Sequence, residues 1–151
     1  MRLRLLPFFF FGLFFFGSTF CVAGDLAIVV DTKNEISSVS ELELEKLLKA
    51  SDPKWPNGRS VKVFLTDPRG AETRTILPRV YKMTPEQIKK FVDAHKGDIR
   101  VVGSDEIVLA MVASNPGAIG IVNVYSINSH VKVIKVDQKL PLEQGYLLHG
   151  N

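Results

Sequence analysis

Blocks of apolar and polar residues alternate along the chain after residue 24, in an order that predicts strands and helices in turn. The continuous apolar run Leu26–Asp31 predicts a strand buried on both faces, as in a parallel sheet. Gly120 lies inside another apolar run and predicts a close approach of backbone there. The other predicted strands are Val61–Leu65, Ile99–Val102, Ala118–Val124 and Val131–Val136, the last with the alternation of a half-exposed or edge strand.

Capping signals predict helices between these strands. Ser40 with Glu43, and Thr84 with Gln87, have the spacing of a capping box, in which a hydroxyl and a carboxylate or amide satisfy each other's backbone N–H groups. The predicted helices begin at Ser40, at Glu72, at Thr84 and at Ser104 or Asp105. The second helix, Glu72–Met83, contains Pro78, which predicts a kink or a division. The last helix is apolar nearly all round from residue 107 to 113, so burial on more than one side is expected.

Two further segments have weaker patterns. Trp55 precedes a Pro-Asn-Gly turn, and we expect it to cap the core rather than to stack on a ligand, because aromatic side chains mostly supply buried area. Gln138–Asn151 is predicted to be a tail packed on the surface. Strands that alternate with helices of about ten residues are typical of an α/β domain with a mostly parallel sheet and helices on both faces. One compact domain is expected over residues 24–151.

The first 23 residues have the pattern of a secretory signal peptide. Arg2 and Arg4 precede a Phe-rich apolar stretch that ends near Phe20, and Cys21-Val22-Ala23 has small residues at its two ends. We therefore expect export to a bacterial periplasm with cleavage after Ala23 or Gly24. An uncleaved membrane anchor is the alternative, and a signal followed by a cleavage site favours processing.

Composition then excludes several classes of function. Loss of Arg2 and Arg4 lowers the net charge from +3 to +1, which removes the compositional support for nucleic-acid binding. The only Cys is also in the signal, so the mature chain has no thiol chemistry. Its three His are scattered without metal-ligand spacing, and no GxSxG, GxGxxG or P-loop motif is present. We expect no metal, no cofactor and no enzyme activity.

The stretch Val61–Arg74 has the pattern of an anion site. It reads as a buried strand, a polar turn with Gly70, and the start of a helix. The first turn of a helix has unpaired N–H groups and a partial positive charge, so it attracts anions. Thr66, Arg69 and Thr73 add polar side chains that could donate hydrogen bonds to an oxyanion.

The segment from Ser114 to Val122, SNPGAIGIV, resembles the T-P-G-A-I-G-Y-V segment of phosphate-type periplasmic substrate-binding proteins. The order of strand, capped helix, Trp-containing turn and strand, and the VVGSD segment at 101–105, are similar to the small, truncated branch of that family. The similarity covers Leu26 to about Val136. It implies a type 2 periplasmic-binding-protein-like fold and a phosphate-like oxyanion carried to an ABC transporter.

The turn departs from the R-x-D-G-S motif of that family. Carried over by position, Gly70 is kept, whereas Asp67 stands at the Arg position, Arg69 at the Asp position and Ala71 at the Ser position. A carboxylate facing an oxyanion repels it unless a proton is shared, and Ala71 removes a hydroxyl donor. An ordinary Asp–Pro turn with a solvated Arg69 is therefore the competing interpretation.

Two hypotheses follow. In the first, the protein is an exported solute-binding-like protein that binds a small oxyanion weakly at Thr66, Arg69, Gly70, Ala71 and Thr73, with an ABC transporter permease as its partner. In the second, it is a periplasmic interaction or accessory module that kept the fold without the ligand and binds another periplasmic protein.

Overall fold

The computed structural model describes residues 24–49 and 51–150. The predicted signal peptide lies outside the described residues. The strands are β1 (Leu26–Asp31), β2 (Ser38–Val39), β3 (Val63–Leu65), β4 (Ile99–Val101), β5 (Ile119–Asn123), β6 (Val131–Val133) and β7 (Lys135–Val136). The helices are α1 (Glu41–Lys49), α2 (Thr73–Tyr81), α3 (Pro85–Ala94) and α4 (Asp105–Ser114), with a 3₁₀ turn at Val124–Ser126.

Five strands form one sheet in the order β4-β3-β5-β1-β6, and β2 pairs with β7 in a small parallel sheet. β3 is parallel to both β4 and β5. β1 is antiparallel to β5 and to β6, so four strands run in one direction and β1 runs in the other. The prediction of a mostly parallel sheet is confirmed. The parallel setting expected for Leu26–Asp31 is wrong, although the strand is buried at every position.

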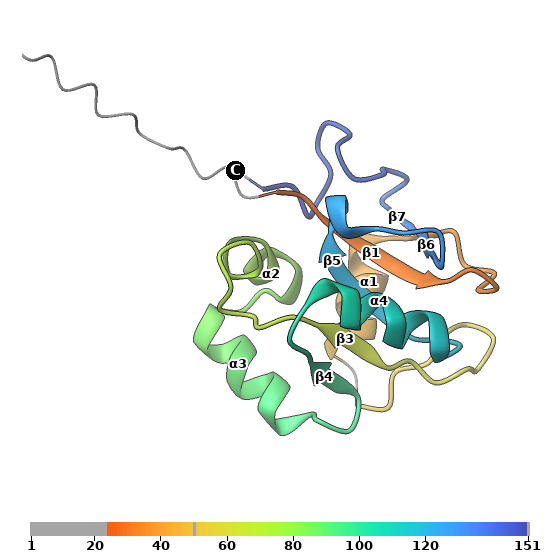
Figure 1. Ribbon diagram of the computed structural model, residues 1–151. Coiled ribbons are helices and arrows are strands. Elements are labelled where there is room, and N and C mark those ends of the chain that lie inside the picture. The colour runs from red at the N-terminus through yellow and green to blue at the C-terminus, as the bar shows by residue number, and fades with distance from the viewer. Residues whose placement is uncertain (1–23, 50, 151) are drawn as a thin grey trace, which may run out of the picture.

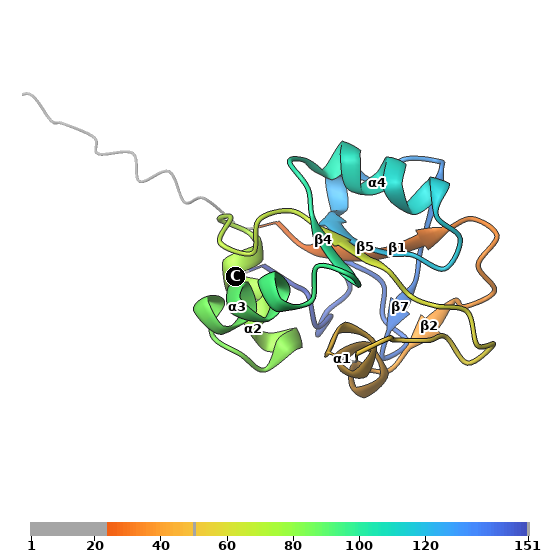
Figure 2. The same ribbon diagram turned by 90° about the horizontal axis from the view of Figure 1, so that it is seen from below.

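Helices cover both faces of the main sheet, as predicted. Figure 2 shows α4 on one face and α1, α2 and α3 on the other. Successive residues of β1 belong to different cores: Ala27 and Val29 pack with α4, and Ile28 and Val30 pack with the other three helices. Two covered faces explain why β1 reads as a continuous apolar run rather than as an alternating one.

The predicted caps are present. The Ser40 hydroxyl accepts a hydrogen bond from Glu43 N at 3.2 Å, and the Glu43 carboxylate accepts one from Ser40 N at 2.7 Å. Thr84 and Gln87 form the second capping box. The Ser104 hydroxyl accepts from Ile107 N at the start of α4. Hydroxyl and carboxylate groups thus satisfy N–H groups that the first turn of a helix leaves open.

Pro78 does not divide α2, and α4 is less buried than its sequence predicts. α2 contains Pro78 and continues through it as one helix to Tyr81, where Lys82 adopts a left-handed conformation. α4 was expected to be buried on more than one side, and this is wrong: Val108, Leu109 and Val112 are buried, whereas Ile107 is 47% exposed. A helix can be apolar on all sides even where the fold provides only one layer to bury it.

The C-terminal segment was expected to lie on the surface, and this holds for residues 138–145 but is wrong from Tyr146 onward. Tyr146 and Leu148 are buried in the core beneath α1, α2 and α3. Leu26 N donates to Leu148 O at 3.0 Å, so the end of the chain lies beside the start of β1 (Figure 1). The Asp25 carboxylate strengthens this junction by accepting from Leu142 N and Gly150 N, both at 3.0 Å, and it contacts His149 Nδ1 at 2.6 Å.

Trp55 caps the core as expected, with 3% of its surface exposed. The predicted strand Val131–Val136 is divided in two, with β6 at the edge of the main sheet and β7 in the small one. Within the described residues, none of the helices has the length and apolar composition needed to cross a lipid bilayer.

Candidate functional site

The five predicted site residues lie together on the turn that joins β3 to α2. Gly70 N donates to Asp67 O at 2.9 Å, which closes the turn, and Arg74 N donates to Gly70 O at 3.0 Å, which begins the helix. The turn follows the carboxyl end of β3, and ligands of open α/β sheets bind outside that end of the strands. The location therefore suits a binding site.

The carboxylate of Asp67 and the guanidinium of Arg69 bond to each other across the turn. Arg69 Nε donates to Oδ1 at 3.1 Å and Nη2 donates to Oδ2 at 2.9 Å, and Arg69 N also donates to Oδ1 at 2.9 Å. Hydrogen bonds from Arg69 hold the pKa of Asp67 below its usual range, and the same pairing raises the pKa of Arg69. Asp67 therefore stays negative next to the positions where an oxyanion would sit.

The other predicted site residues offer little to a ligand in this arrangement. Thr73 is 4% exposed, and its hydroxyl donates to Asp67 O at 2.6 Å. Gly70 is packed against the same two groups, because a Cβ there would lie 3.1 Å from Asp67 O and from Thr73 Oγ1. Thr66 is half-buried and Ala71 is exposed without a polar side chain. The Thr73 hydroxyl thus braces the turn from inside rather than pointing out of it.

The N-terminus of α2 has no side-chain cap. Glu72 occupies the N-cap position in a helical conformation and makes no capping hydrogen bond to the first turn. Its carboxylate instead accepts from Asn123 Nδ2 at 2.8 Å, at the end of β5. Backbone carbonyls satisfy part of the first turn, because Arg74 N donates to Gly70 O and Thr75 N to Glu72 O, so only part of the positive charge at the start of α2 is left to solvent or to an anion.

A polar network that the sequence analysis missed lies beside this helix start. Asn123 N donates to Asp105 Oδ2 at 2.9 Å, and the Ser126 hydroxyl donates to the same oxygen at 2.8 Å. Glu72 and Asp105 thus flank Asn123 at the carboxyl ends of β3, β4 and β5. The only sequence signal was the acidic residue after the Ser104 cap. The network adds two more carboxylates to this end of the sheet, which disfavours a multiply charged anion.

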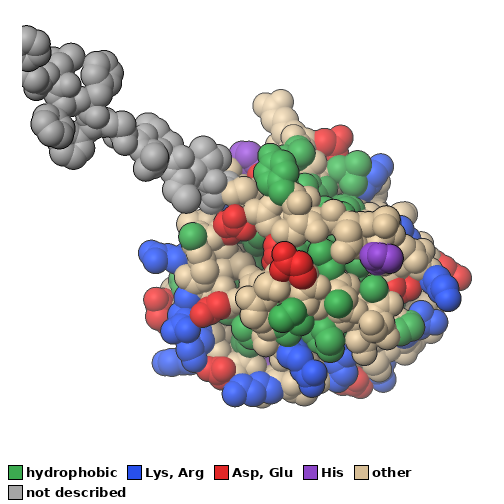
Figure 3. Space-filling view, in the orientation of Figure 1, with side chains coloured by type: hydrophobic (Ala, Val, Ile, Leu, Met, Phe, Trp, Pro, Cys, Tyr) green, Lys and Arg blue, Asp and Glu red, His purple; other side chains and the backbone are tan. Residues whose placement is uncertain are grey.

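A small cavity of about 210 Å³ lies between the turn and α3. Its charged lining residues are Asp67, Arg69, Lys89 and Asp93, and Lys89 Nζ is 2.6 Å from Asp93 Oδ2. Figure 3 shows Lys and Arg side chains mixed with Asp and Glu over α3, without a surface of one sign. Opposite charges in the cavity wall therefore largely satisfy each other. Within residues 24–49 and 51–150, no cluster of His, Cys, Asp and Glu is suited to hold a metal ion.

The fold is that of the periplasmic-binding-protein class of phosphate receptors. It is similar to the crystal structure of an ABC-type phosphate transport receptor from Vibrio cholerae, with a TM-score of 0.66 and 17% identity over 85% of this chain and 56% of that one. It is also similar to PstS from Borrelia burgdorferi, with a TM-score of 0.67 and 17% identity over 86% of this chain and 56% of that one. No protein-family model matches the sequence, and no curated protein matches it.

The resemblance inferred from the sequence is thus confirmed at the level of the fold. At 17% identity the likeness extends to the fold and no further. The chain spans about half the length of each of these two proteins. The Vibrio cholerae protein is named as a transport receptor for phosphate.

Proposed function

We propose that the protein is an exported solute-binding-like protein of the periplasm that binds phosphate or a similar small oxyanion weakly, for an ABC transporter. The observation that carries the proposal is the first turn of α2, which has no side-chain cap and lies shortly after Gly70 and the carboxyl end of β3. Backbone N–H groups at such a helix start bind an oxyanion through the helix dipole and direct hydrogen bonds. The fold shared with phosphate receptors supports a solute-binding role.

Arg69 is the side chain we assign to the anion. It is paired with Asp67 in the turn, but both side chains are more than half exposed. Water screens such pairs, so an incoming oxyanion can compete for the guanidinium. An arginine can then offer two parallel N–H donors to the oxyanion. The nearby carboxylate lowers affinity, and for this reason we expect weak binding.

Isothermal titration of the purified protein with phosphate, sulfate and molybdate tests the proposal. We expect saturable heat with at least one anion and its loss in Arg69→Ala. The matched control is Arg100→Ala, which removes an exposed arginine of β4, outside the β3–α2 turn. Absence of heat with all three anions, at protein concentrations that reveal micromolar binding, contradicts the proposal.

A second candidate function is an interaction module that keeps the fold without a ligand. The closed turn favours it, because Arg69, Thr73 and Gly70 make their polar contacts within the turn itself. This function predicts that Arg69→Ala changes nothing measurable in anion titrations. It also predicts a complex with another periplasmic protein, or a dimer, in light-scattering measurements.

A further inference from the structure

Among residues 24–49 and 51–150, no strand pairs with the edge of β2 that faces away from β7. β2 pairs with β7 through Ser37 and Val39, whose carbonyl oxygens accept from Lys135 N and Asp137 N, both at 2.9 Å. Backbone groups of successive residues in a strand point to opposite sides, so those of Ser38 face away from β7. Unpaired edge groups of this kind can pair with another strand.

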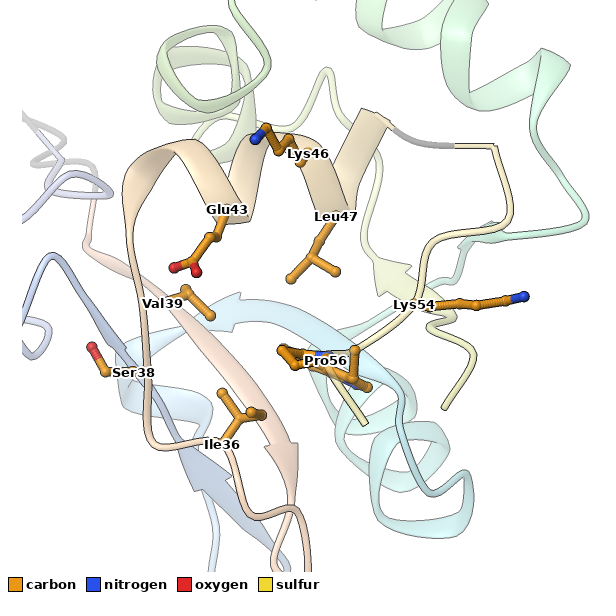
Figure 4. Close-up of a pocket in the computed structure, with 9 residues that line it drawn as sticks. Ile36, Ser38, Val39, Glu43, Lys46, Leu47, Lys54 and Pro56 are labelled. Carbon is orange, nitrogen blue, oxygen red and sulfur yellow. The ribbon is translucent and has the colours of Figure 1, made fainter. Parts of the chain in front are cut away.

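An apolar pocket of about 240 Å³ lies directly beside this edge. Its lining is mainly apolar, with Ile36, Val39, Leu47, Trp55 and Pro56, and it also includes Ser38, Glu43, Lys46 and Lys54. Figure 4 shows Leu47 extending from α1 toward Val39 and Pro56, with Ile36 on the opposite wall. Leu47 and Ile36 are each only half-buried, so an apolar group placed between them would cover surface that water now contacts.

The pocket continues into an acidic hollow, and the two together form a groove beside β2. The adjoining cavity of about 360 Å³ shares Ser38, Val39 and Glu43 with the pocket and is also lined by Asp137. Its lining has two carboxylates and, among the described residues, no cationic side chain. Hydrogen bonds from Ser40 keep the pKa of Glu43 below its usual value, so this carboxylate is charged at neutral pH. Figure 4 shows the Lys46 and Lys54 side chains of the pocket directed away from Glu43, so a cationic group that reaches the hollow itself would meet the two carboxylates and be attracted.

We propose that this groove binds an extended peptide segment of a partner protein. The peptide adds as a strand along Ser38, places one large apolar side chain in the pocket, and directs an adjacent Lys or Arg toward Glu43 and Asp137. Main-chain pairing to a free edge combined with a side-chain pocket is a recurrent mode of peptide recognition. The inference is independent of the anion site, which lies on the β3–α2 turn.

Selection of short random peptides displayed on phage against the purified full chain tests the proposal. We expect the selected peptides to share a large apolar residue next to Lys or Arg. A synthetic peptide of the selected sequence should change the fluorescence of Trp55, the only Trp in the chain and a wall of the pocket. No enrichment over a bare support, or selected peptides without that pattern, would overturn the inference.

Pairs of variants distinguish the contribution of the groove from that of the rest of α1. Leu47→Glu should weaken peptide binding at least about tenfold, because it places a charge in the apolar pocket. Leu42→Glu is the matched control, since Leu42 is 59% exposed on the same helix and outside the pocket lining. Ser38→Pro should weaken binding by removing an edge N–H, while Ser38→Ala should not.

Circular dichroism and thermal unfolding establish that each variant is folded. Asp137→Asn, which keeps the shape of the side chain, should weaken a basic peptide more than the same peptide with norleucine in place of Lys. Equal affinity of the wild type, Leu47→Glu and Ser38→Pro for the peptide contradicts the proposal. Self-association that Leu47→Glu abolishes would also overturn it, because the occupant would then be a second copy of this chain.

Discussion

The indole Nε1 of Trp55 donates a hydrogen bond to the carbonyl oxygen of Gly117 at 2.8 Å. The bond joins two turns that are 62 positions apart in the sequence, one after α1 and one before β5. Gly117 has φ +92°, and a Cβ there would lie 2.8 Å from Ser60 O. The turn before β5 therefore depends on glycine and on the indole together.

Trp55→Phe should lower the free energy of unfolding by about 1–3 kcal/mol. Phe keeps an aromatic ring in the core but leaves the buried Gly117 carbonyl without its donor, and an unmatched buried polar group costs about that much. Urea unfolding followed by far-ultraviolet circular dichroism measures the change, since no tryptophan remains. Tyr125→Phe, at an 81% exposed position, is the control. Equal midpoints for the two variants would contradict the prediction.

Gly120→Ala should also destabilise the protein, by about 1–3 kcal/mol, because the core around it has no room. An added Cβ would lie 2.8 Å from Val112 Cγ2 and from Val29 Cγ2, and 2.9 Å from Val108 Cγ1. Gly97→Ala is the matched control, since nothing lies within 4 Å of the equivalent Cβ. Denaturant unfolding of both variants tests the prediction, which fails if Gly120→Ala is as stable as the control.

Local patterns were sufficient for most of the fold. The caps at Ser40, Thr84 and Ser104 were predictable because each depends on residues within three positions of one another. The direction of β1 was not, because a strand covered on both faces is apolar throughout whether its neighbours are parallel or antiparallel. The exposure of Ile107 was also missed, since periodicity does not say how many layers a helix meets.

The candidate site was predictable in location and less so in detail. Thr66, Arg69, Gly70, Ala71 and Thr73 do lie on one turn at the start of a helix. The sequence alone does not determine whether the Arg69 side chain faces solvent, a ligand or Asp67. The Glu72–Asn123–Asp105 network joins residues from distant parts of the chain, so no local spacing indicates it.

Leu148→Ala should lower the free energy of unfolding by about 2–5 kcal/mol, as expected for truncation of a fully buried leucine. A C-terminal segment lying on the surface would give almost no effect. Leu42→Ala, at a 59% exposed position, provides that comparison within the same protein. Chemical unfolding monitored by Trp55 fluorescence measures both. A Leu148→Ala effect as small as that of Leu42→Ala would contradict the burial of the segment.

Arg69→Ala should raise the pKa of Asp67 toward its ordinary value, because the hydrogen bonds from Arg69 lower it. A carboxyl whose pKa is depressed in the folded state contributes stability above its unfolded pKa, and that contribution disappears as the pH falls through the folded pKa. The pair should therefore matter near neutrality and not in strong acid. An NMR titration of the Asp67 carboxyl carbon in both proteins measures the shift, and identical titration curves would contradict it.

Asp67→Asn tests whether the pairing of Asp67 with Arg69 affects anion binding. It removes the negative charge beside the α2 N-terminus and frees Arg69 from its ion pair, while Asn can still accept the hydrogen bond from Arg69 N. If the turn binds oxyanions, phosphate affinity should rise several-fold, since both changes favour an anion. Wild-type affinity for sulfate, which keeps its charge in weak acid, should likewise rise as strong acid protonates Asp67, whose pKa lies below its usual range, and Asp67→Asn should lose that rise. If neither protein gives binding heat with an anion at any pH, the result instead favours the interaction module. A turn that binds no anion is not affected in these titrations by the charge at position 67.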